Sequence, residues 1–243
     1  MGASQQGACR RRVTAPDPQR SAAPEGKANP VCSHGPVGSR SWFQDSGGVA
    51  VLYPVIMSVA AAQRGLKGPA KVRHLSARAR QALAVSAARS GVALPHLSKD
   101  DRGAPLPVNG VYWSVSHKPD YVAGVVSPHP VGIDLEEIRT FSEGVRRKIA
   151  DEAEWALSSE APELRFFRFW TAKEAVLKAA GTGLSELSRC RVQSVPDGRR
   201  LILAYRGDLV VVAHFFFDHH LSAVAPNAHQ VRWSLLGAED PAV

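Results

Sequence analysis

The heptapeptide Val131-Gly132-Ile133-Asp134-Leu135-Glu136-Glu137 alternates apolar and acidic side chains in the way that a β-strand with two unlike faces does. In an extended chain successive side chains point to opposite faces, so Ile133 and Leu135 point one way while Asp134 and Glu136 point the other. Two carboxylates on one face make half a site for a hard cation such as Mg²⁺, which prefers oxygen ligands. A half-buried strand whose polar face is solvated is the alternative interpretation.

The residues on either side of this strand predict an α+β protein. Before it we expect a strand over 49–56, a helix over 71–91 and two strands over 110–117 and 121–127. With it and after it we expect a strand over 131–138, helices over 142–158 and 164–180, and strands over 192–195, 201–205, 209–217 and 221–224. The order strand, helix, hairpin occurs twice, which predicts two similar lobes that meet at a cleft.

The helix expected over 164–180 carries the stretch Phe166-Phe167-Arg168-Phe169-Trp170-Thr171-Ala172-Lys173-Glu174-Ala175-Val176-Leu177-Lys178. Trp170, Glu174 and Lys178 lie in one row, because side chains four residues apart share a helix face. A Glu four residues before a Lys is also the favoured order of an exposed pair that stabilises a helix by about 0.2–0.5 kcal/mol. The bulky aromatic neighbours favour partial burial, and buried charges need a partner or a task.

A third candidate stretch, Trp113-Ser114-Val115-Ser116-His117, ends the strand expected over 110–117. Alternation sends Trp113, Val115 and His117 to one face and the serines to the other. A single histidine is more often structural than functional. As a phosphate contact, His117 would offer ring N–H donors beside the Ser116 hydroxyl.

Composition describes a globular protein: of 243 residues, 44% are hydrophobic and 21% are charged. The longest apolar run, 49–62, is broken by Pro54 and is too short to cross a bilayer, so we expect no membrane association. Cys9, Cys32 and Cys190 are too few and too scattered for a disulfide framework or a zinc pair. These features predict a reducing, cytoplasmic setting.

The net charge of +8 suits an acidic partner such as nucleic acid, a phosphate-rich small molecule or an acidic protein. Half of it lies in residues 1–40, which hold six basic and two acidic side chains and lack hydrophobic periodicity. We therefore expect residues 1–46 to form a disordered basic leader. The rest divides into an N-terminal lobe over 47–130, a C-terminal lobe with the metal site over 131–236, and a tail over 237–243.

Taken in order, S-x-S-H, V-G-I-D-L-E and F-W-x-x-K-E-A-x-x-x-K closely resemble the signature of the 4′-phosphopantetheinyl transferase superfamily, in its pseudo-dimeric, Sfp-like type. The resemblance spans about residues 67–226 and implies two lobes related by a pseudo-twofold axis, with coenzyme A bound in the cleft. It also implies Mg²⁺-dependent transfer of 4′-phosphopantetheine from coenzyme A to a serine of an apo acyl or peptidyl carrier protein, releasing 3′,5′-ADP. Such carriers serve fatty acid, polyketide or nonribosomal peptide biosynthesis.

The resemblance also implies roles for single residues. Asp134, Glu136 and Glu174 match the metal-binding carboxylates, with Mn²⁺ as an alternative to Mg²⁺. Glu174 would also help to deprotonate the carrier serine, and Lys178 would neutralise charge at the pyrophosphate. The coenzyme A contacts would be Lys67, Arg80, Arg102, Gly103, Pro105, Ser116, His117 and Lys178, with His117 at the 3′-phosphate.

Two positions depart from the family pattern. Ala104 stands where the family's G-K-P loop has a lysine, so Arg102 or another basic residue must replace a phosphate contact. Lys118 follows His117 where a serine is common, and restores part of the charge.

Two other functions stay open: a coenzyme A-binding homologue with impaired catalysis, and a basic module that binds nucleic acid or another polyanion. The predicted folded part lacks clustered basic residues interleaved with exposed aromatics, so we expect no nucleic-acid partner. We expect a monomer, because two lobes of one chain build the cleft.

Overall fold

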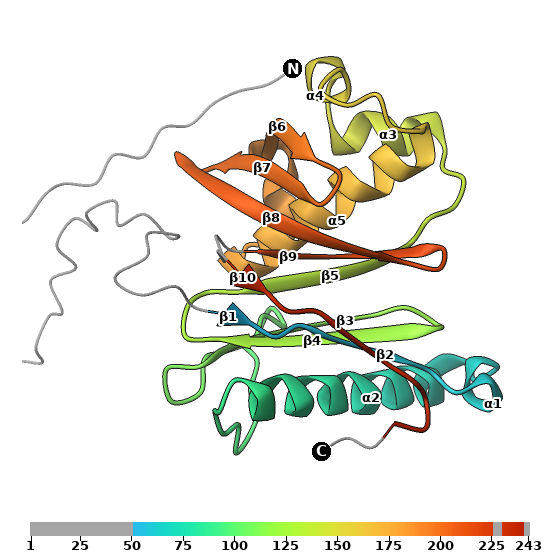
Figure 1. Cartoon of the computed structure of the whole chain (residues 1–243), viewed down its shortest axis with the longest axis vertical. Coiled ribbons are helices and arrows are strands. Elements are labelled where there is room, and N and C mark those ends of the chain that lie inside the picture. The colour runs from blue at the N-terminus through green and yellow to red at the C-terminus, as the bar shows by residue number, and fades with distance from the viewer. Residues whose placement is uncertain (1–50, 226–229, 241–243) are drawn as a thin grey trace, which may run out of the picture. The chain divides into compact units, whose positions relative to one another are not determined.

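Two β-sheets, each packed against one long helix, organise the part of the chain that the computed structural model describes, residues 51–225 and 230–240 (Figure 1). The α+β class expected from the sequence is confirmed. The leader expected over 1–46 lies outside the described residues, as do the first two residues of the strand expected over 49–56. All described residues belong to one compact unit.

The first sheet has the strand order β11-β2-β4-β3. Its strands are β2 (Val55–Ser58), β3 (Tyr112–His117), β4 (Tyr121–Ser127) and β11 (Ser234–Leu236). β4 pairs antiparallel with both β2 and β3, whereas β11 joins β2 in parallel. Two short strands, β1 (Val51–Leu52) and β10 (Gln230–Val231), form a separate parallel pair.

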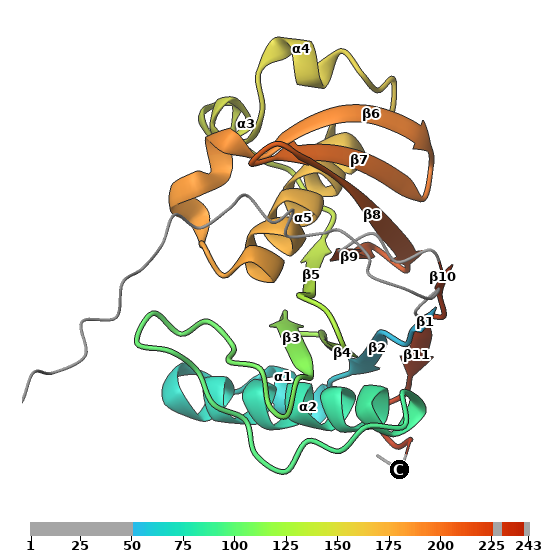
Figure 2. The same ribbon diagram turned by 90° about the vertical axis from the view of Figure 1, so that its left-hand side faces the viewer.

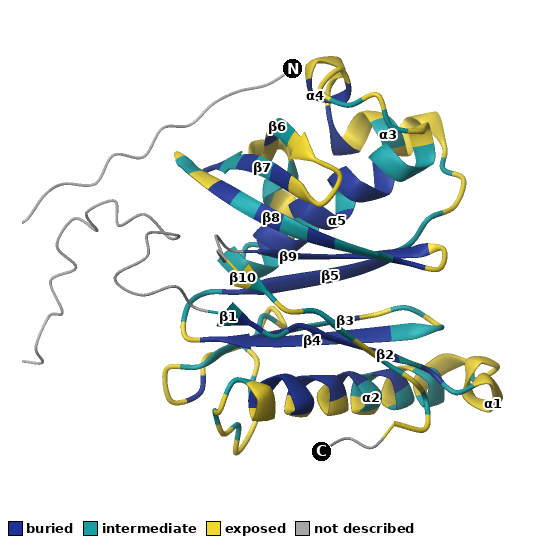
Figure 3. Ribbon diagram, in the orientation of Figure 1, coloured by how far each residue is buried: buried dark blue, intermediate teal, exposed yellow. Residues whose placement is uncertain are grey.

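Helix α2 (Gly68–Arg89), which corresponds to the helix expected over 71–91, packs on this sheet and is preceded by the short α1 (Ala61–Arg64). Leu75, Ala79, Ala82 and Leu83 are buried, while the opposite side of the helix is exposed (Figure 3). Gly124 on β4 permits this packing, because a Cβ there would lie 2.6 Å from the backbone nitrogen of Leu83.

The second sheet is antiparallel and has the order β5-β9-β8-β7-β6. Its strands are β5 (Gly132–Glu137), β6 (Arg191–Asp197), β7 (Arg200–Tyr205), β8 (Asp208–Phe217) and β9 (His220–Ala225). Helix α5 (Pro162–Ala180) packs against β5, β8 and β9, and a 3₁₀ helix, η1 (Leu184–Arg189), follows it (Figure 2). The helix expected over 164–180 and the four strands expected over 192–224 are confirmed.

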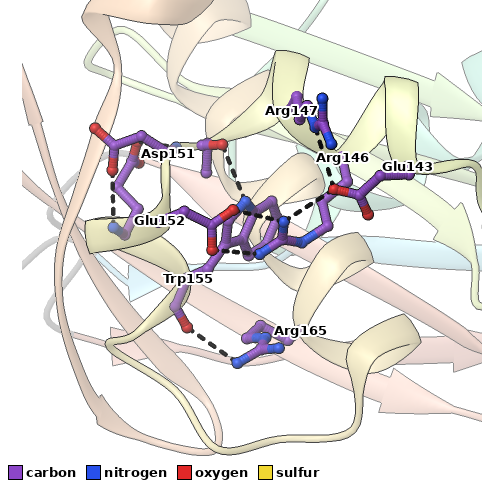
Figure 4. Close-up of polar contacts among 9 residues, drawn as sticks. Glu143, Arg146, Arg147, Asp151, Glu152, Trp155 and Arg165 are labelled. Carbon is purple, nitrogen blue, oxygen red and sulfur yellow. Dashed lines mark hydrogen bonds and ion pairs between the residues drawn. The ribbon is translucent and has the colours of Figure 1, made fainter.

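The single helix expected over 142–158 is wrong: the chain forms α3 (Glu143–Ile149) and α4 (Glu152–Trp155) instead. Ala150 is extended, and Asp151 begins the second helix with a capping box, in which its carboxylate accepts from the Glu154 backbone N–H. Across the break, Arg146 bonds both carboxylate oxygens of Glu152 and its guanidinium lies 5.2 Å from the Trp155 ring centroid (Figure 4). The break between α3 and α4 is therefore a defined turn that these contacts stabilise.

The two sheets meet where β5 packs against β3 and β4. An apolar cluster lies between them, with Ile56 and Val125 from the first sheet and Ile133 and Leu135 from β5. β3 and β5 are edge strands of their sheets, and side chains link them. The Ile133 backbone N–H donates to Ser114 Oγ at 3.1 Å. This junction brings the three candidate stretches of the sequence together.

Strand β11, near the C-terminus, does not join the second sheet. The predicted division assigns residues 131–236 to one lobe, whereas β11 adds to the first sheet beside β2. A short strand that completes a distant sheet leaves no local sequence signal. None of the helices in the described ranges combines the length and apolar character that crossing a bilayer requires.

Candidate functional site

Strand β5 presents the two faces that its sequence predicts. Ile133 and Leu135 are fully buried between the sheets. Asp134 and Glu136, which are 5% and 7% exposed, line a cavity of about 350 Å³ on the other face. The interpretation of this strand as one with a solvated polar face is therefore wrong, because both carboxylates are buried.

Helix α5 brings its row of side chains to the same cavity. Trp170, Glu174 and Lys178 all line it, one helical turn apart. The helix comes this close because β5 begins with Gly132: a Cβ there would lie 1.9 Å from the carbonyl oxygen of Ala175. The glycine thus sets how near Glu174 lies to the acidic face of β5.

Two side chains of the α5 row, Trp170 and Lys178, bond to β5 rather than along their own helix. Lys178 Nζ lies 2.7 Å from Asp134 Oδ1 and also donates to the carbonyl oxygen of Ile133 at 3.1 Å. Trp170 Nε1 donates to Glu136 Oε1 at 2.8 Å. Glu174 and Lys178 therefore do not form an exposed pair on the helix surface, because both side chains line the cavity.

The end of β3 supplies the third wall. Ser116 Oγ donates to Asp134 Oδ1 at 3.0 Å, and the ammonium of Lys118, just past the strand, lies 2.7 Å from Glu136 Oε2. His117 lies between these two residues on the chain and also lines the cavity. We call this space the carboxylate cavity; its full lining is Lys99, Val115, Ser116, His117, Lys118, Asp134, Glu136, Trp170, Glu174 and Lys178.

A second space of about 300 Å³, which we call the loop cavity, adjoins the first. Lys99, Val115, Glu174 and Lys178 line both. The loop cavity is otherwise lined by Arg102, Gly103, Ala104, Pro105, Ser114, Leu177, Gly181, Thr182 and Gly183. The loop that contains Arg102, Gly103, Ala104 and Pro105 is therefore a neighbour of the predicted metal-binding face, although the two are far apart in the sequence.

The side chain of Asp100 and backbone hydrogen bonds hold the loop of residues 99–105. Asp100 Oδ1 accepts from the backbone N–H groups of Arg102 and Ala104, at 3.0 and 2.7 Å. Lys99 bridges to Pro105 across the loop. Because this turn is fixed by its own hydrogen bonds, Lys99 and Arg102 are kept in the lining of the loop cavity.

Burial and mutual repulsion shift the titration of the cavity groups. Burial first, and then the charge of Asp134, raises the pKa of the Glu136 carboxyl above its ordinary value. The same two causes raise the pKa of Glu174. Burial, followed by the charges of Lys178 and Lys118, lowers the pKa of His117. The three carboxylates thus repel one another, and an added cation would relieve that repulsion.

The donor set fits a divalent cation, although the side chains do not already form a metal-binding cluster. Within residues 51–225 and 230–240, no group of three His, Cys, Asp or Glu side chains is placed to hold a metal ion. Lysines instead bond to Asp134 and Glu136. Asp134 Oδ2, however, is buried and has no hydrogen-bond partner. A buried carboxylate oxygen without a donor is a ready ligand for a hard cation.

The remaining predicted coenzyme contacts lie elsewhere. Lys67 precedes α2 and Arg80 lies on its exposed side, and neither of these described residues lines the two cavities. Sequence reasoning missed Lys99, which lines both cavities. The local sequence signal for Lys99 was the stretch K-D-D-R-G over residues 99–103, in which Asp100 forms the turn that returns the chain toward Lys99. Thr182 and Gly183, just past α5, were missed as well.

The sequence of this chain is similar to that of a known protein family. The model of the 4′-phosphopantetheinyl transferase superfamily matches residues 130–230 of the chain. This stretch of the chain is similar to that superfamily. The match includes Asp134, Glu136, Glu174 and Lys178, and excludes the loop of residues 99–105 and the end of β3.

Individual relatives carry the same name as the superfamily. 4′-Phosphopantetheinyl transferase psf-1 of Bacillus pumilus is 40% identical over 92 residues, which are 35% of this chain and 40% of the relative. 4′-Phosphopantetheinyl transferase gsp of Aneurinibacillus migulanus is 33% identical over 90 residues, covering 35% and 38% of the two chains. 4′-Phosphopantetheinyl transferase HetI of Nostoc is 30% identical over 109 residues, covering 40% and 46%. This chain thus aligns with less than half the length of each of these three relatives.

Proposed function

We propose that this chain transfers 4′-phosphopantetheine from coenzyme A to a serine of an apo acyl or peptidyl carrier protein. The observation that supports this most is the pair of adjoining cavities with Glu174 and Lys178 in the wall they share. An anionic coenzyme that spans both cavities would have its pyrophosphate beside these two residues. We further propose a cytoplasmic monomer that acts without nucleic acid or membrane.

The basic residues of the loop cavity suit the nucleotide end of coenzyme A. Lys99 and Arg102 supply positive charge to its lining, and Gly103 and Pro105 shape a loop against which a base can lie. Lys99 compensates for Ala104, since it lies across the same loop from it. His117 and Ser116 extend the lining toward the carboxylates, where ring N–H groups can contact a phosphate.

Asp134, Glu136 and Glu174 would hold a Mg²⁺ or Mn²⁺ ion in the carboxylate cavity. When bound, such an ion neutralises charge on pyrophosphate oxygens. Ser116 and Lys178 keep Asp134 in place through their bonds to Oδ1, so that Oδ2 stays open. The protein contributes position and charge, which is most of what phosphoryl transfer requires.

Glu174 is the base in the proposed reaction. Its carboxylate accepts the proton of the carrier serine as the serine oxygen bonds to the phosphorus that bears pantetheine. The bond from that phosphorus to the bridging oxygen breaks, and 3′,5′-ADP leaves with the electron pair. Lys178 offsets the charge that grows on the leaving group. Because burial raises the pKa of Glu174, it is a stronger base than an exposed glutamate.

Substitution of Glu174 tests this function. With coenzyme A, Mg²⁺ and an apo carrier protein, the wild type should add one phosphopantetheinyl group per carrier, as measured by intact mass. Glu174→Gln should lower the rate at least about 100-fold, the order expected for loss of a general base. Glu163→Gln, the same change on the first turn of α5, is the matched control and should keep the wild-type rate. Equal rates for both variants would refute the role of Glu174.

A further inference from the structure

Lys118 forms an ion pair with Glu136, one of the predicted metal ligands. Its ammonium lies 2.7 Å from Glu136 Oε2, with the lysine side chain 31% exposed and the glutamate side chain 9% exposed. The backbone N–H of Lys118 donates to the carbonyl oxygen of Tyr121, which fixes the turn that carries it. The lysine therefore reaches inward from a fixed surface turn toward a buried carboxylate.

Glu136 differs from Asp134 in how its oxygens are used. Both oxygens of Glu136 already accept hydrogen bonds, Oε1 from Trp170 Nε1 at 2.8 Å and Oε2 from Lys118. Asp134 shares its Oδ1 between Ser116 and Lys178 and keeps Oδ2 without a partner. A cation can thus reach Asp134 through an oxygen that has no donor, whereas at Glu136 it would share an oxygen with the indole N–H or with the ammonium of Lys118.

Of the two donors on Glu136, Lys118 is the one that can leave. Trp170 is held in the middle of α5, and its indole is a neutral donor. Lys118 carries its charge on a flexible stem that is partly exposed, so water can solvate the released ammonium. An ammonium and a divalent cation on the same carboxylate would also repel each other.

Besides contacting Glu136, Lys118 lines two cavities. Lys118, Glu136 and Trp170 line the carboxylate cavity and also a separate space of about 590 Å³. Arg139, Phe141 and Phe166 are among the other residues that line that space. An ammonium released from Glu136 can therefore turn into either of these two spaces.

We propose that Lys118 is a displaceable counter-ion, which occupies Glu136 while no divalent cation is bound and leaves it when one binds. Lys118 thereby weakens the cation affinity of this chain by competing for one ligand. The inference rests on the cation site of the proposed function, but its test needs neither coenzyme A nor a carrier protein.

Calorimetric titration with Mg²⁺ alone tests the proposal. Lys118→Met removes the charge and keeps the length of the stem, and it should bind Mg²⁺ about tenfold more tightly than the wild type. Lys99→Met removes the same charge from the lining of the same cavity but not from Glu136, so its gain should stay below about threefold. An unchanged affinity in Lys118→Met, equal gains in both variants, or no Mg²⁺ binding in any of the three proteins would overturn the proposal.

The Trp170 indole N–H gives a second readout, because it donates to Glu136. In ¹H–¹⁵N spectra, with the signal assigned by Trp170→Phe, Mg²⁺ should shift this resonance in the wild type and at lower concentration in Lys118→Met. A resonance that stays in place at saturating Mg²⁺ would show that Glu136 takes no part and would overturn the proposal. Absence of transfer activity would not alter either readout, so the two proposals fail separately.

Discussion

Replacement of Gly132 by alanine tests whether the approach of α5 to β5 builds the site. A Cβ at this position would lie 1.9 Å from the carbonyl oxygen of Ala175 and 2.6 Å from the backbone nitrogen of Ala179. Ordinary contacts begin near 3.4 Å, so the nearer one is about 1.5 Å too short. Both atoms belong to the helix backbone, and relief therefore requires α5 to move as a body.

Such a movement acts on the site more than on the fold. Glu174 adjoins Ala175 in sequence and Lys178 adjoins Ala179, so both side chains would shift by about 1 Å from β5, the order of misplacement that costs about 100-fold in rate. Overpacking of this kind lowers the free energy of unfolding by about 1–3 kcal/mol, which leaves a stable protein folded. We therefore expect Gly132→Ala to fold and to lose about two orders of magnitude in transfer rate.

Gly124→Ala is the matched control, because a Cβ there would lie 2.6 Å from the backbone nitrogen of Leu83, in the packing of α2 on the other sheet. It should lower stability by a similar amount while keeping most of the transfer rate of the folded protein. Stability is measured by urea unfolding, and the rate by mass gain of the carrier. A Gly132→Ala rate within about twofold of that of Gly124→Ala would refute this account of the α5 approach.

Three further predictions concern charges. Lys173→Met would leave Glu154, now 2.6 Å from the ammonium, buried without its partner, and should lower the free energy of unfolding by about 3–5 kcal/mol in urea; an unchanged midpoint would contradict this. Burial lowers the pKa of His214 to about 3, so the unfolded chain takes up a proton that the native protein does not, and stability falls as the pH drops from about 6.5 toward 3. His214→Gln, which keeps a donor for the carbonyl oxygen of Arg168, should remove this part of the pH slope, at most about 1.4 kcal/mol per pH unit; an unchanged slope would count against it. Lys99→Met should weaken coenzyme A binding about tenfold in calorimetry, and unaltered affinity would show that Lys99 does not replace the lysine missing at Ala104.

Local periodicity was enough to predict the acidic strand and the helix row. Ile133 and Leu135 are buried between the sheets and the two carboxylates face a cavity, as alternation requires. The row of Trp170, Glu174 and Lys178 faces the same cavity. Such predictions succeed because a strand and a helix each fix the direction of every side chain from its position in the sequence.

Features that depend on distant contacts were not predictable in this way. The pairing of Lys118 with Glu136 and of Lys178 with Asp134 arises only when the β3 and β5 edges meet. The return of β11 to β2 likewise depends on a partner far away in the sequence. The corner at Asp151, in contrast, had a local signal, the D-x-x-E capping box, which the helical pattern on either side obscured. The pseudo-twofold relation of the two halves stays a prediction.

Two neighbouring residues of α5 belong to the same sequence motif and have different roles. Lys173 and Glu174 are adjacent in sequence and lie on different faces of the helix. Lys173 is buried against the corner of α3 and α4, where it bonds to Glu154 and to the carbonyl oxygen of Ile149. Glu174 faces the two cavities. The lysine of the K-E pair is therefore a packing residue, and the glutamate is the candidate base.

The measurement that tests the central proposal most directly is intact-protein mass spectrometry of an apo acyl carrier protein incubated with this chain, coenzyme A and Mg²⁺, with and without a chelator. The account predicts a mass gain of one phosphopantetheinyl group per carrier that depends on the chain and is abolished by the chelator. Absence of any gain with several apo carriers, while coenzyme A still binds, would contradict the proposed transfer and favour an impaired coenzyme A-binding homologue.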